Sequence, residues 1–374
     1  MISPKFFIEK LHNEGIGFYA GVPDSLLKNV CAYITDHFDQ YHHIIAANEG
    51  GAIALAAGYH LATGKVGCVY MQNSGEGNAI NPLASLTDRE VYNIPVLLLI
   101  GWRGRPGVHD EPQHVKQGKI TTSLLDTLGI NYDVLGKDES VATKQIDKAI
   151  DEIKSTGQAY ALVVEKDTFD GYALQQTSTN SLTLTREEAI RIVAESIPTN
   201  AVIVSTTGMI SRELFEYRTA MGESHEQDFL TVGSMGHASM IALGIALQQP
   251  HRPVYCFDGD GATIMHLGNM AIVGSKQPSN YVHIVFNNGA HDSVGGQPTV
   301  GFDIDLVEIA HAVQYTHAER VETLEALQKA ISGLNHEQLS LIEVRVKKGN
   351  RKDLGRPTTT PVQNKEALMH FLAK

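Results

Sequence analysis

The sequence predicts an α/β protein of two domains, each built on a mainly parallel β-sheet flanked by helices. Three observations lead to this prediction. The chain has 374 residues, 43% of them hydrophobic, which at roughly 100–200 residues per domain is enough for two buried cores. Short apolar runs typical of buried strands alternate with helical patterns in both halves. A polar, Ser/Thr-rich stretch at 175–185 separates the halves.

In the first half, apolar runs predict strands, and amphipathic or small-residue patterns predict helices. The run PVLLLIGW, which begins at Pro95, is apolar at successive positions, as is typical of strands buried on both faces of a parallel sheet. Strands are expected at 17–20, 42–47, 65–72, 95–102 and 160–165, and helices at 5–12, 25–37, 49–63, 78–86 and about 120–128.

The second half repeats this alternation. Strands are expected at 201–205, 253–257, 281–286 and 339–346, and helices at 238–247 and 262–275. Thr185, followed three positions later by Glu188, is typical of a capping box and predicts the start of a helix. We therefore expect domains at 1–170 and 186–374, joined by a linker at 171–185. Ligands of parallel sheets bind at the carboxyl ends of strands, so the strand-to-helix loops should hold the chemistry.

The composition limits the partners that the chain can have. Its formal net charge is -12 and its pI about 5.8, which argues against a nucleic acid or an anionic membrane surface. No apolar run reaches the roughly 18 residues of a membrane span, and no signal peptide is visible. Cys31, Cys68 and Cys256 follow no metal or disulfide spacing, so we expect them to be buried and reduced. These features favour a cytoplasmic protein.

The most informative motif lies at two consecutive strand ends. Gly259-Asp260-Gly261 follows one expected strand, and Asn287-Asn288 ends the next, with residues 262–286 between them. That separation suits one helix and one strand, and it brings Asp260 and Asn288 to the same sheet edge. Mg²⁺ prefers hard oxygen ligands and commonly shares them with phosphates, while glycines let the backbone approach a phosphate closely. The motif therefore predicts a site for magnesium and a diphosphate.

With this motif the sequence resembles the thiamine-diphosphate-dependent enzymes, which implies two domains of the thiamine-diphosphate-binding fold. The resemblance implies that Asp260, Asn288 and the carbonyl of Ala290 bind Mg²⁺. It also implies that a glutamate in the first domain binds N1′ of the aminopyrimidine and assists deprotonation of thiazolium C2. Glu49 fits this role, because it follows the apolar run HHIIAA and opens a helix rich in Ala and Gly.

The same resemblance assigns further cofactor contacts. Met235, in Gly233-Ser234-Met235-Gly236, matches the apolar residue that wedges under the cofactor, and the Gly233 carbonyl would accept from the 4′-amino group. Asn78, in a Gly-rich turn, would lie against the cofactor. Candidate diphosphate contacts are Thr206, Thr207 and Gly208, together with Gly259 and Gly261.

The chain has no third, central domain, and its whole length resembles the short family members that decarboxylate phosphonopyruvate or sulfopyruvate. Two basic loops suit a 2-oxo acid with an additional anionic head, because arginine pairs bidentately with phosphonate and carboxylate oxygens. The candidate substrate-binding residues are Ser25, Arg103, Arg105, Arg351, Lys352 and Arg356. The candidates for proton transfer or positioning are Asp24, His109, Asp110, Gln113, His114 and His291, of which His114 and His291 are preferred.

The expected activity is thiamine-diphosphate-dependent decarboxylation of 3-phosphonopyruvate to phosphonoacetaldehyde and CO₂, in aminoethylphosphonate biosynthesis. Three alternatives stay open: a sulfopyruvate decarboxylase, an acetolactate-synthase-like carboligase, and a degenerate scaffolding subunit without activity. The resemblance also implies a homodimer or higher homo-oligomer, because two subunits usually build each site in this family.

Overall fold

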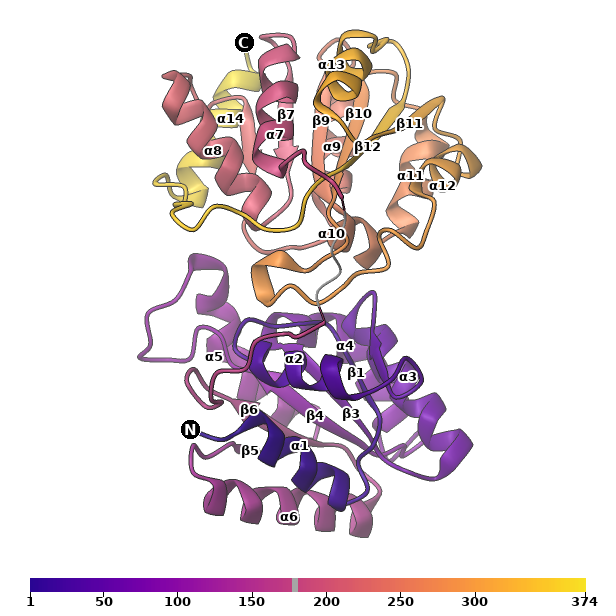
Figure 1. Cartoon of the computed structure of the whole chain (residues 1–374), viewed down its shortest axis with the longest axis vertical. Coiled ribbons are helices and arrows are strands. Elements are labelled where there is room, and N and C mark those ends of the chain that lie inside the picture. The colour runs from indigo at the N-terminus through magenta and orange to yellow at the C-terminus, as the bar shows by residue number, and fades with distance from the viewer. Residues whose placement is uncertain (177–180) are drawn as a thin grey trace. The chain divides into compact units, whose positions relative to one another are not determined.

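The computed structural model describes residues 1–176 and 181–374 (Figure 1). The described chain divides into two compact units: residues 1–176 with Val294–Gln297, and residues 181–293 with Pro298–Lys374. Part of the predicted linker, residues 177–180, lies outside the described residues. The backbone N–H groups of Gln175 and Gln176 donate to the Asp36 carboxylate at 2.8 and 2.9 Å, so the linker's beginning packs on the first unit.

The described part of the first unit contains a six-stranded, fully parallel sheet in the order β2-β1-β3-β4-β6-β5. Its strands are β1 (Tyr19–Gly21), β2 (His43–Ile45), β3 (Gly67–Gln72), β4 (Val96–Gly101), β5 (Asn131–Val134) and β6 (Tyr160–Val164). Its helices are α1 (Pro4–Asn13), α2 (Lys28–His37), α3 (Glu49–Thr63), η1 (Asn73–Gly75), α4 (Glu76–Pro82), η2 (Leu83–Thr87), α5 (Pro112–Thr127) and α6 (Glu139–Thr156).

The described part of the second unit contains another six-stranded parallel sheet, in the order β11-β12-β10-β9-β7-β8. Its strands are β7 (Val202–Ser205), β8 (Asp228–Leu230), β9 (Val254–Gly259), β10 (Tyr281–Asn287), β11 (His317–Val321) and β12 (Ser340–Arg345). Its helices are α7 (Arg186–Ser196), α8 (Met209–Met221), α9 (Ala238–Gln248), α10 (Asp260–Met265), α11 (Gly268–Lys276), η3 (Asp292–Val294), α12 (Leu306–Ala312), α13 (Leu324–Ser332) and α14 (Pro361–Leu372).

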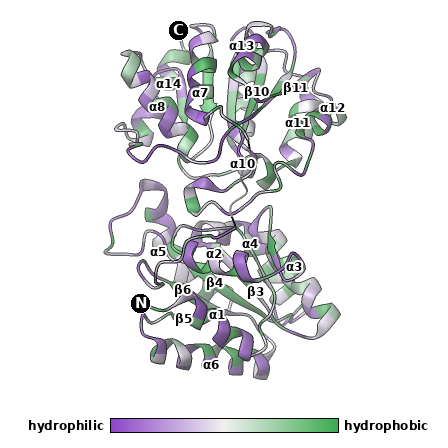
Figure 2. Ribbon diagram, viewed as in Figure 1, coloured by the Kyte–Doolittle hydropathy of each residue, from purple (hydrophilic) through white to green (hydrophobic). Residues whose placement is uncertain are grey.

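The inner strands of both sheets are buried on both faces, which explains their apolar sequences. In β4, Leu97 and Leu99 pack into one apolar cluster, whereas Leu98 and Ile100 pack into the cluster on the other face. Because successive side chains of a strand point to opposite faces, a strand with helices on both sides must be apolar throughout. Figure 2 shows the result, with hydrophobic strands inside each unit and hydrophilic residues on the outer helix faces. The predicted fold class is confirmed.

Several boundaries differ from the prediction. The predicted helix 262–275 is two helices, because His266 leaves the helical conformation at φ -133° and ψ 53°. Helix α5 begins at Pro112, eight residues before the expected 120. Helix α6 and strand β5 were not predicted. Strand β5 has a weak hydrophobic pattern, because this short edge strand is only partly buried. Helix α6 does have an apolar stripe at helical spacing, formed by Ala142, Ile146, Ala149, Ile150 and Ile153.

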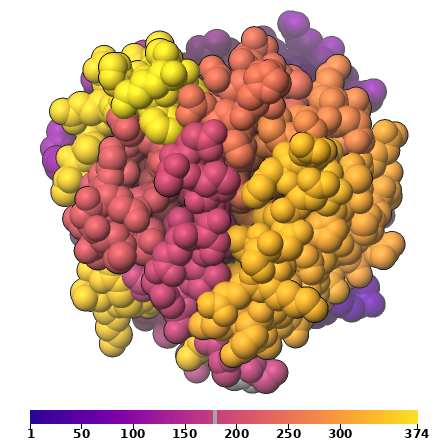
Figure 3. Space-filling model, turned by 90° about the horizontal axis from the view of Figure 1, so that it is seen from above, coloured from indigo at the N-terminus to yellow at the C-terminus, as the bar shows by residue number. Residues whose placement is uncertain are grey.

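Other predictions hold. Thr185 and Glu188 form the capping box that starts α7. The three cysteines are free and buried. In residues 1–176 and 181–374, no helix has both the length and the apolarity that a bilayer crossing requires. Figure 3 shows that α13 lies beside α7, although more than a hundred residues separate them.

The topology of each sheet determines where its functional loops meet. In the first sheet β2 lies on one side of β1, and β3 and the later strands lie on the other side. The order of the strands therefore reverses between β1 and β3, and the loops that follow these two strands diverge there. In the second sheet β7 and β9 are neighbours whose following helices lie on opposite faces, and β10 lies beside β9. Ligands of parallel sheets bind at such points. The predicted site residues Ser25, Asn78, Thr207, Asp260 and Asn288 all follow strands at these two edges.

Candidate active site

Glu49 is the first residue of α3, directly after the N-cap Asn48, whose side chain accepts from the Gly51 N–H at 2.9 Å. Its carboxylate is buried, with 5% of the residue exposed, and accepts from Asn78 Nδ2 at 2.8 Å. A Cβ on Gly75 would overlap this carboxylate, so a larger residue there would displace Glu49 from its position. Burial raises the pKa of Glu49, and the Asn78 hydrogen bond partly offsets this effect. The structure thus brings together the predicted Glu49 and Asn78.

Glu76, at the start of α4, is a second buried carboxyl in this turn, with 3% exposed. Burial raises its pKa to about 8, against a smaller opposite effect of the Thr121 hydroxyl. The folded state therefore holds a proton at Glu76 that the unfolded state loses above its ordinary pKa of 4.5. As a consequence, the pH range from about 4.5 to 8 should progressively destabilise the fold through this residue.

We expect Glu76→Gln to stabilise the protein by about 2–4 kcal/mol at pH 8.5 and to have almost no effect at pH 4.5, since one pKa unit is worth about 1.4 kcal/mol. Urea unfolding at both pH values measures this difference. Glu337→Gln, at an exposed position, is the matched control. An equal effect of Glu76→Gln at both pH values would contradict the expectation.

The loop after β4 is anchored by Asn73, a fully buried residue that was not among the predicted site residues. Its side chain donates to the Arg103 carbonyl at 2.8 Å and accepts from the Arg103 N–H at 3.2 Å. It also donates to Thr121 Oγ1 at 2.9 Å. This amide therefore connects the Gly-rich turn after β3 to the loop that carries Arg103. Its partners Arg103 and Thr121 lie 30 and 48 residues away in sequence, so a local sequence pattern cannot predict these contacts.

Arg103 lies at the centre of a polar cluster at the ends of β1 and β4. Its Nε donates to Asp110 Oδ2 at 2.8 Å, and its Nη2 donates to Asp110 Oδ1. Its Nη1 donates to Ser25 Oγ at 2.7 Å. Asp24 beside them is fully buried, and burial raises its pKa to about 6 although Arg103 acts in the opposite direction. The predicted Ser25, Arg103, Asp24 and Asp110 are thus brought together.

Two further predicted residues, His114 and Arg105, differ in their environment and charge. His114, on α5, is 7% exposed, and burial, together with the charge of Arg103, lowers its pKa to about 4. The imidazole is therefore neutral near pH 7. Arg105 forms an ion pair with Glu165 at 2.7 Å, and its guanidinium lies 5.8 Å from the Trp102 ring centre. Arg105 is thus already paired with a carboxylate of its own unit.

In the second unit, the loops after β7 and β8 meet. The Gly233 N–H donates to Thr207 Oγ1 at 3.2 Å, and Gly208 has a φ of 102°, a conformation that glycine adopts readily. Met235 is half-buried, and its neighbour Gly236 is held through its carbonyl by Asn269 Nδ2 at 3.0 Å. The predicted diphosphate and wedge segments therefore lie at one edge of the second sheet.

Gly261 lies where Met235 and His291 converge. A Cβ on Gly261 would lie 3.0 Å from the His291 ring and 3.5 Å from Met235 Cε, so glycine allows both side chains to approach. Burial lowers the pKa of His291 to about 4. The wedge residue, the GDG motif and the preferred histidine of this unit thus form one group.

Asp260 and Asn288 lie together at the ends of β9 and β10. Asp260 is 3% exposed, and burial raises its pKa to about 6, although hydrogen bonds from the Thr299 hydroxyl and from backbone N–H groups, including that of Asn288, act in the opposite direction. In the described residues 1–176 and 181–374, no lysine or arginine is among the main influences on the pKa of Asp260. This buried carboxylate, with Asn288 and the buried Ala290 next to it, provides the hard oxygen donors that Mg²⁺ prefers. The residues therefore fit a magnesium ion.

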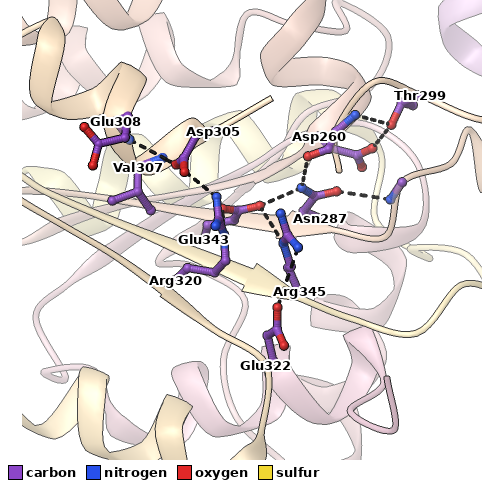
Figure 4. Close-up of polar contacts among 12 residues, drawn as sticks. Asp260, Asn287, Thr299, Asp305, Val307, Glu308, Arg320, Glu322, Glu343 and Arg345 are labelled. Atoms are coloured by element: carbon purple, nitrogen blue, oxygen red, sulfur yellow. Dashed lines mark hydrogen bonds and ion pairs between the residues drawn. The ribbon is translucent and has the colours of Figure 1, made fainter. Parts of the chain in front are cut away.

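Asn287, the first residue of the NN pair, forms hydrogen bonds that hold the loop after β10 in place (Figure 4). Its amide donates to the Gly301 carbonyl at 2.6 Å and to Glu343 Oε1 at 2.7 Å, and its oxygen accepts from the Gly289 N–H at 3.1 Å. Glu343 is fully buried and also accepts from the guanidinium groups of Arg320 and Arg345. Gly301 leaves no space for a Cβ, which would lie 2.6 Å from Asn287 Oδ1.

Comparisons with known proteins agree with this geometry. The N-terminal TPP binding domain of thiamine pyrophosphate enzymes matches residues 4–125, and the C-terminal TPP binding domain matches residues 206–344. The phosphonopyruvate decarboxylase of Streptomyces viridochromogenes is 34% identical, with 97% of this chain and 93% of the relative covered. That of Streptomyces hygroscopicus is 33% identical, with 96% and 92% covered. The sulfopyruvate decarboxylase of Methanosarcina acetivorans is 28% identical, with 97% and 95% covered.

The chain belongs to the thiamine pyrophosphate-dependent decarboxylases. Within this family assignment, the N-terminal match includes Glu49, Asn78 and Arg103, and the C-terminal match includes Asp260 and Asn288. The N-terminal match thus includes β1 to β4, and the C-terminal match includes β8 to β11 and most of β12.

In the second basic loop of this decarboxylase, which follows β12, Arg351 is paired with carboxylates. Arg351 forms ion pairs with Glu187 at 2.9 Å, with Asp353 at 3.3 Å and with Glu216. These carboxylates come from α7, α8 and the loop itself. Arg351 therefore ties the segment after β12 to two helices, a structural role that its sequence neighbours do not reveal.

Proposed function

We propose that this decarboxylase converts 3-phosphonopyruvate to phosphonoacetaldehyde and CO₂ with thiamine diphosphate and Mg²⁺, and that the product enters aminoethylphosphonate biosynthesis in the cytoplasm. The similarity to phosphonopyruvate decarboxylases over nearly the whole chain carries this proposal. The Ser25–Arg103–Asp110 cluster supports it, because it places a guanidinium at the edge of the sheet that bears Glu49.

In this proposal, residues of both units act on the aminopyrimidine of the cofactor. Bound thiamine diphosphate supplies a carbanion centre at thiazolium C2. Glu49 holds and moves a proton at N1′ of the aminopyrimidine, a task suited to a carboxyl whose pKa is raised by burial. The Gly233 carbonyl would accept from the 4′-amino group, Met235 would pack against the cofactor, and Asn78 orients Glu49.

The second unit holds the charged end of the cofactor. Asp260 and Asn288, through side-chain oxygens, and Ala290, through its carbonyl, would bind Mg²⁺. The diphosphate would lie against the loops that follow β7 and β9, whose contacts are Thr207, Gly208, Gly259 and Gly261. Because burial makes the charged form of Asp260 unfavourable, a cation there would stabilise it.

The substrate's anionic groups would bind at Arg103 and Ser25. Three of the five N–H donors of Arg103 are used in contacts with Asp110 and Ser25, which leaves donors for a phosphonate. Arg105, Arg351 and Arg356 remain proposed contacts, and the first of them would have to leave its ion pair with Glu165 to reach the substrate. His114 and His291, both neutral near pH 7, are the proposed proton-transfer residues.

Comparing kcat/KM for phosphonopyruvate, sulfopyruvate and pyruvate tests the proposed substrate. We expect phosphonopyruvate to give the highest value and to release phosphonoacetaldehyde. A higher value for sulfopyruvate would replace the proposed substrate. Carbon–carbon bond formation from pyruvate without aldehyde release would favour the carboligase alternative, and no turnover of any of the three acids would favour a scaffolding subunit.

Arg103→Lys should raise KM for phosphonopyruvate about tenfold or more and change kcat less, because lysine keeps the charge but loses the fork of parallel donors. Steady-state kinetics at saturating cofactor measure both constants. Arg89→Lys, at an exposed position, is the matched control. An unchanged KM for Arg103→Lys would remove Arg103 from the proposed substrate site.

We also propose a homodimer or larger homo-oligomer in which two subunits contribute to each site. Helix α3 supports this proposal, because its exposed residues include the small or apolar Gly51, Ala54, Gly58 and Leu61. Helix α9 is apolar around its circumference, yet Leu247 is 46% exposed. An apolar helix with an open face usually packs against another surface.

Multi-angle light scattering should show a dimer or larger species for the wild type. Ala54→Glu should shift it towards monomer and lower its activity together, because a charge would have to be buried in the interface. Ala54→Ser serves as the control of similar size. An active wild-type monomer would contradict the proposal.

A further inference from the structure

Asp292, the first residue of η3, holds the side-chain amide of Asn288. Asn288 Nδ2 donates to Asp292 Oδ2 at 2.6 Å, and Asn288 Oδ1 accepts from the Ala290 N–H at 3.0 Å. A carboxylate accepts hydrogen bonds and donates none, so the NH₂ group must face Asp292. The amide oxygen must then face the opposite side, towards the loop that contains Ala290.

Asp292 is itself held firmly. Its side chain is 8% exposed, and Oδ2 also accepts from the Gly349 N–H at 2.9 Å and from Arg186 Nη1 at 3.3 Å. Arg186 is 5% exposed and donates to both oxygens of the buried Glu213, at 2.8 and 2.9 Å. The acceptor for Asn288 is therefore fixed by α7, α8 and the segment after β12.

The two asparagines of the NN pair have different surroundings. Asn287 is fully buried, and both ends of its amide hold main-chain groups of the loop, at Gly289 and Gly301. Asn288 donates to Asp292 through its side-chain NH₂ group, and its side-chain oxygen accepts from the Ala290 N–H, while its backbone N–H donates to the Asp260 carboxylate. Asn287 thus shapes the loop, and Asn288 presents an oriented oxygen.

We propose that Asp292 is a positioning residue that keeps the oxygen of Asn288, rather than its NH₂ group, directed at the magnesium ion. This inference rests on the proposed Mg²⁺ site at Asp260, Asn288 and Ala290. An amide turned by 180° would point two N–H donors at the cation and remove one ligand. Partners behind the ligands typically change metal affinity by about 10–100-fold when they are lost.

Two substitutions separate orientation from charge. Asp292→Asn keeps an oxygen that can accept from Asn288, Gly349 and Arg186, but removes the negative charge. Asp292→Ala removes both, and a water in the vacated space donates as readily as it accepts, so only the Ala290 N–H would still favour the native orientation of the amide. Asp292→Ser, which also leaves room for a water, replaces the Ala variant if that variant does not fold.

Mg²⁺ affinity is measured by calorimetric titration of Mg²⁺ into metal-free protein with saturating thiamine diphosphate. We expect Asp292→Ala to raise the Mg²⁺ Kd about 10–100-fold and Asp292→Asn to stay within about threefold of wild type. The thiamine diphosphate Kd at saturating Mg²⁺ should be nearly unchanged in both variants. Asp303→Ala, at an exposed position of the same unit, is the control.

Three results would overturn the proposal. Equal weakening in the Ala and Asn variants would mean that the charge of Asp292 acts, not its orienting hydrogen bond. Wild-type affinity in both would mean that Asn288 needs no orienting partner. A wild-type protein that binds thiamine diphosphate without Mg²⁺ would remove the metal site itself, and only this last result would also count against the proposed function.

Discussion

Glu49→Gln is expected to lower kcat about 10²–10⁴-fold, the range that a positioned proton-transfer group contributes. Glutamine has nearly the same shape and can still accept from Asn78, but it cannot gain and lose a proton. The buried environment that raises the pKa of Glu49 serves only a group that titrates. Single-turnover kinetics with phosphonopyruvate measure the chemical step directly.

The affinity for thiamine diphosphate separates chemistry from binding in this variant. We expect its Kd to change by less than about tenfold, because the neutral amide keeps a hydrogen-bonding group at N1′. Glu139→Gln is the matched control: Glu139 also begins a long helix, α6, but is exposed. If the only role of Glu49 were its favourable interaction with the dipole of α3, then Glu49→Gln and Glu139→Gln would have similar small effects on stability, and neither would slow turnover. Turnover within threefold of wild type would remove Glu49 from the mechanism.

The parts of the site that could be predicted from sequence are those encoded locally. Glu49 opens a helix after an apolar strand, and Asp260 and Asn288 occupy consecutive strand ends at a spacing that suits one helix and one strand. Parallel topology then brings these ends to one edge without further information. The structure confirms that Asp260 and Asn288 are adjacent. It also shows a contact between Asn78 and Glu49 that was not predicted.

The parts that could not be predicted depend on contacts between distant residues. Arg351 reads as a free cation in its basic segment, yet Glu187 and Glu216, more than a hundred residues earlier, pair with it. Asn73 reads as part of a glycine turn, and its role in holding the Arg103 loop depends on a neighbouring strand. The charge of a side chain is visible in a sequence, but its partner is decided by packing.

Asp260→Asn is expected to have opposite effects on the metal-free and the cofactor-bound protein. Without metal, burial raises the pKa of Asp260 to about 6 from an ordinary 3.8, so the charged carboxylate destabilises the fold increasingly as the pH rises through this range. At pH 7.5 the substitution should therefore stabilise the metal-free protein by about 1–3 kcal/mol. Thermal unfolding without Mg²⁺ or thiamine diphosphate measures this gain.

With Mg²⁺ and thiamine diphosphate the order should reverse. Ligands that bind only the folded state stabilise it by an amount that grows with their affinity, and the Asn variant should lose at least about 100-fold in Mg²⁺ affinity because its neutral amide replaces the charged ligand. The wild type should then unfold at the higher temperature. Asp303→Asn, an exposed carboxylate in the same unit, should leave both temperatures unchanged. If Asp260→Asn lowers the unfolding temperature equally in both states, Asp260 stabilises the fold and is not a metal ligand, because a ligand's loss is felt mainly when the metal is present.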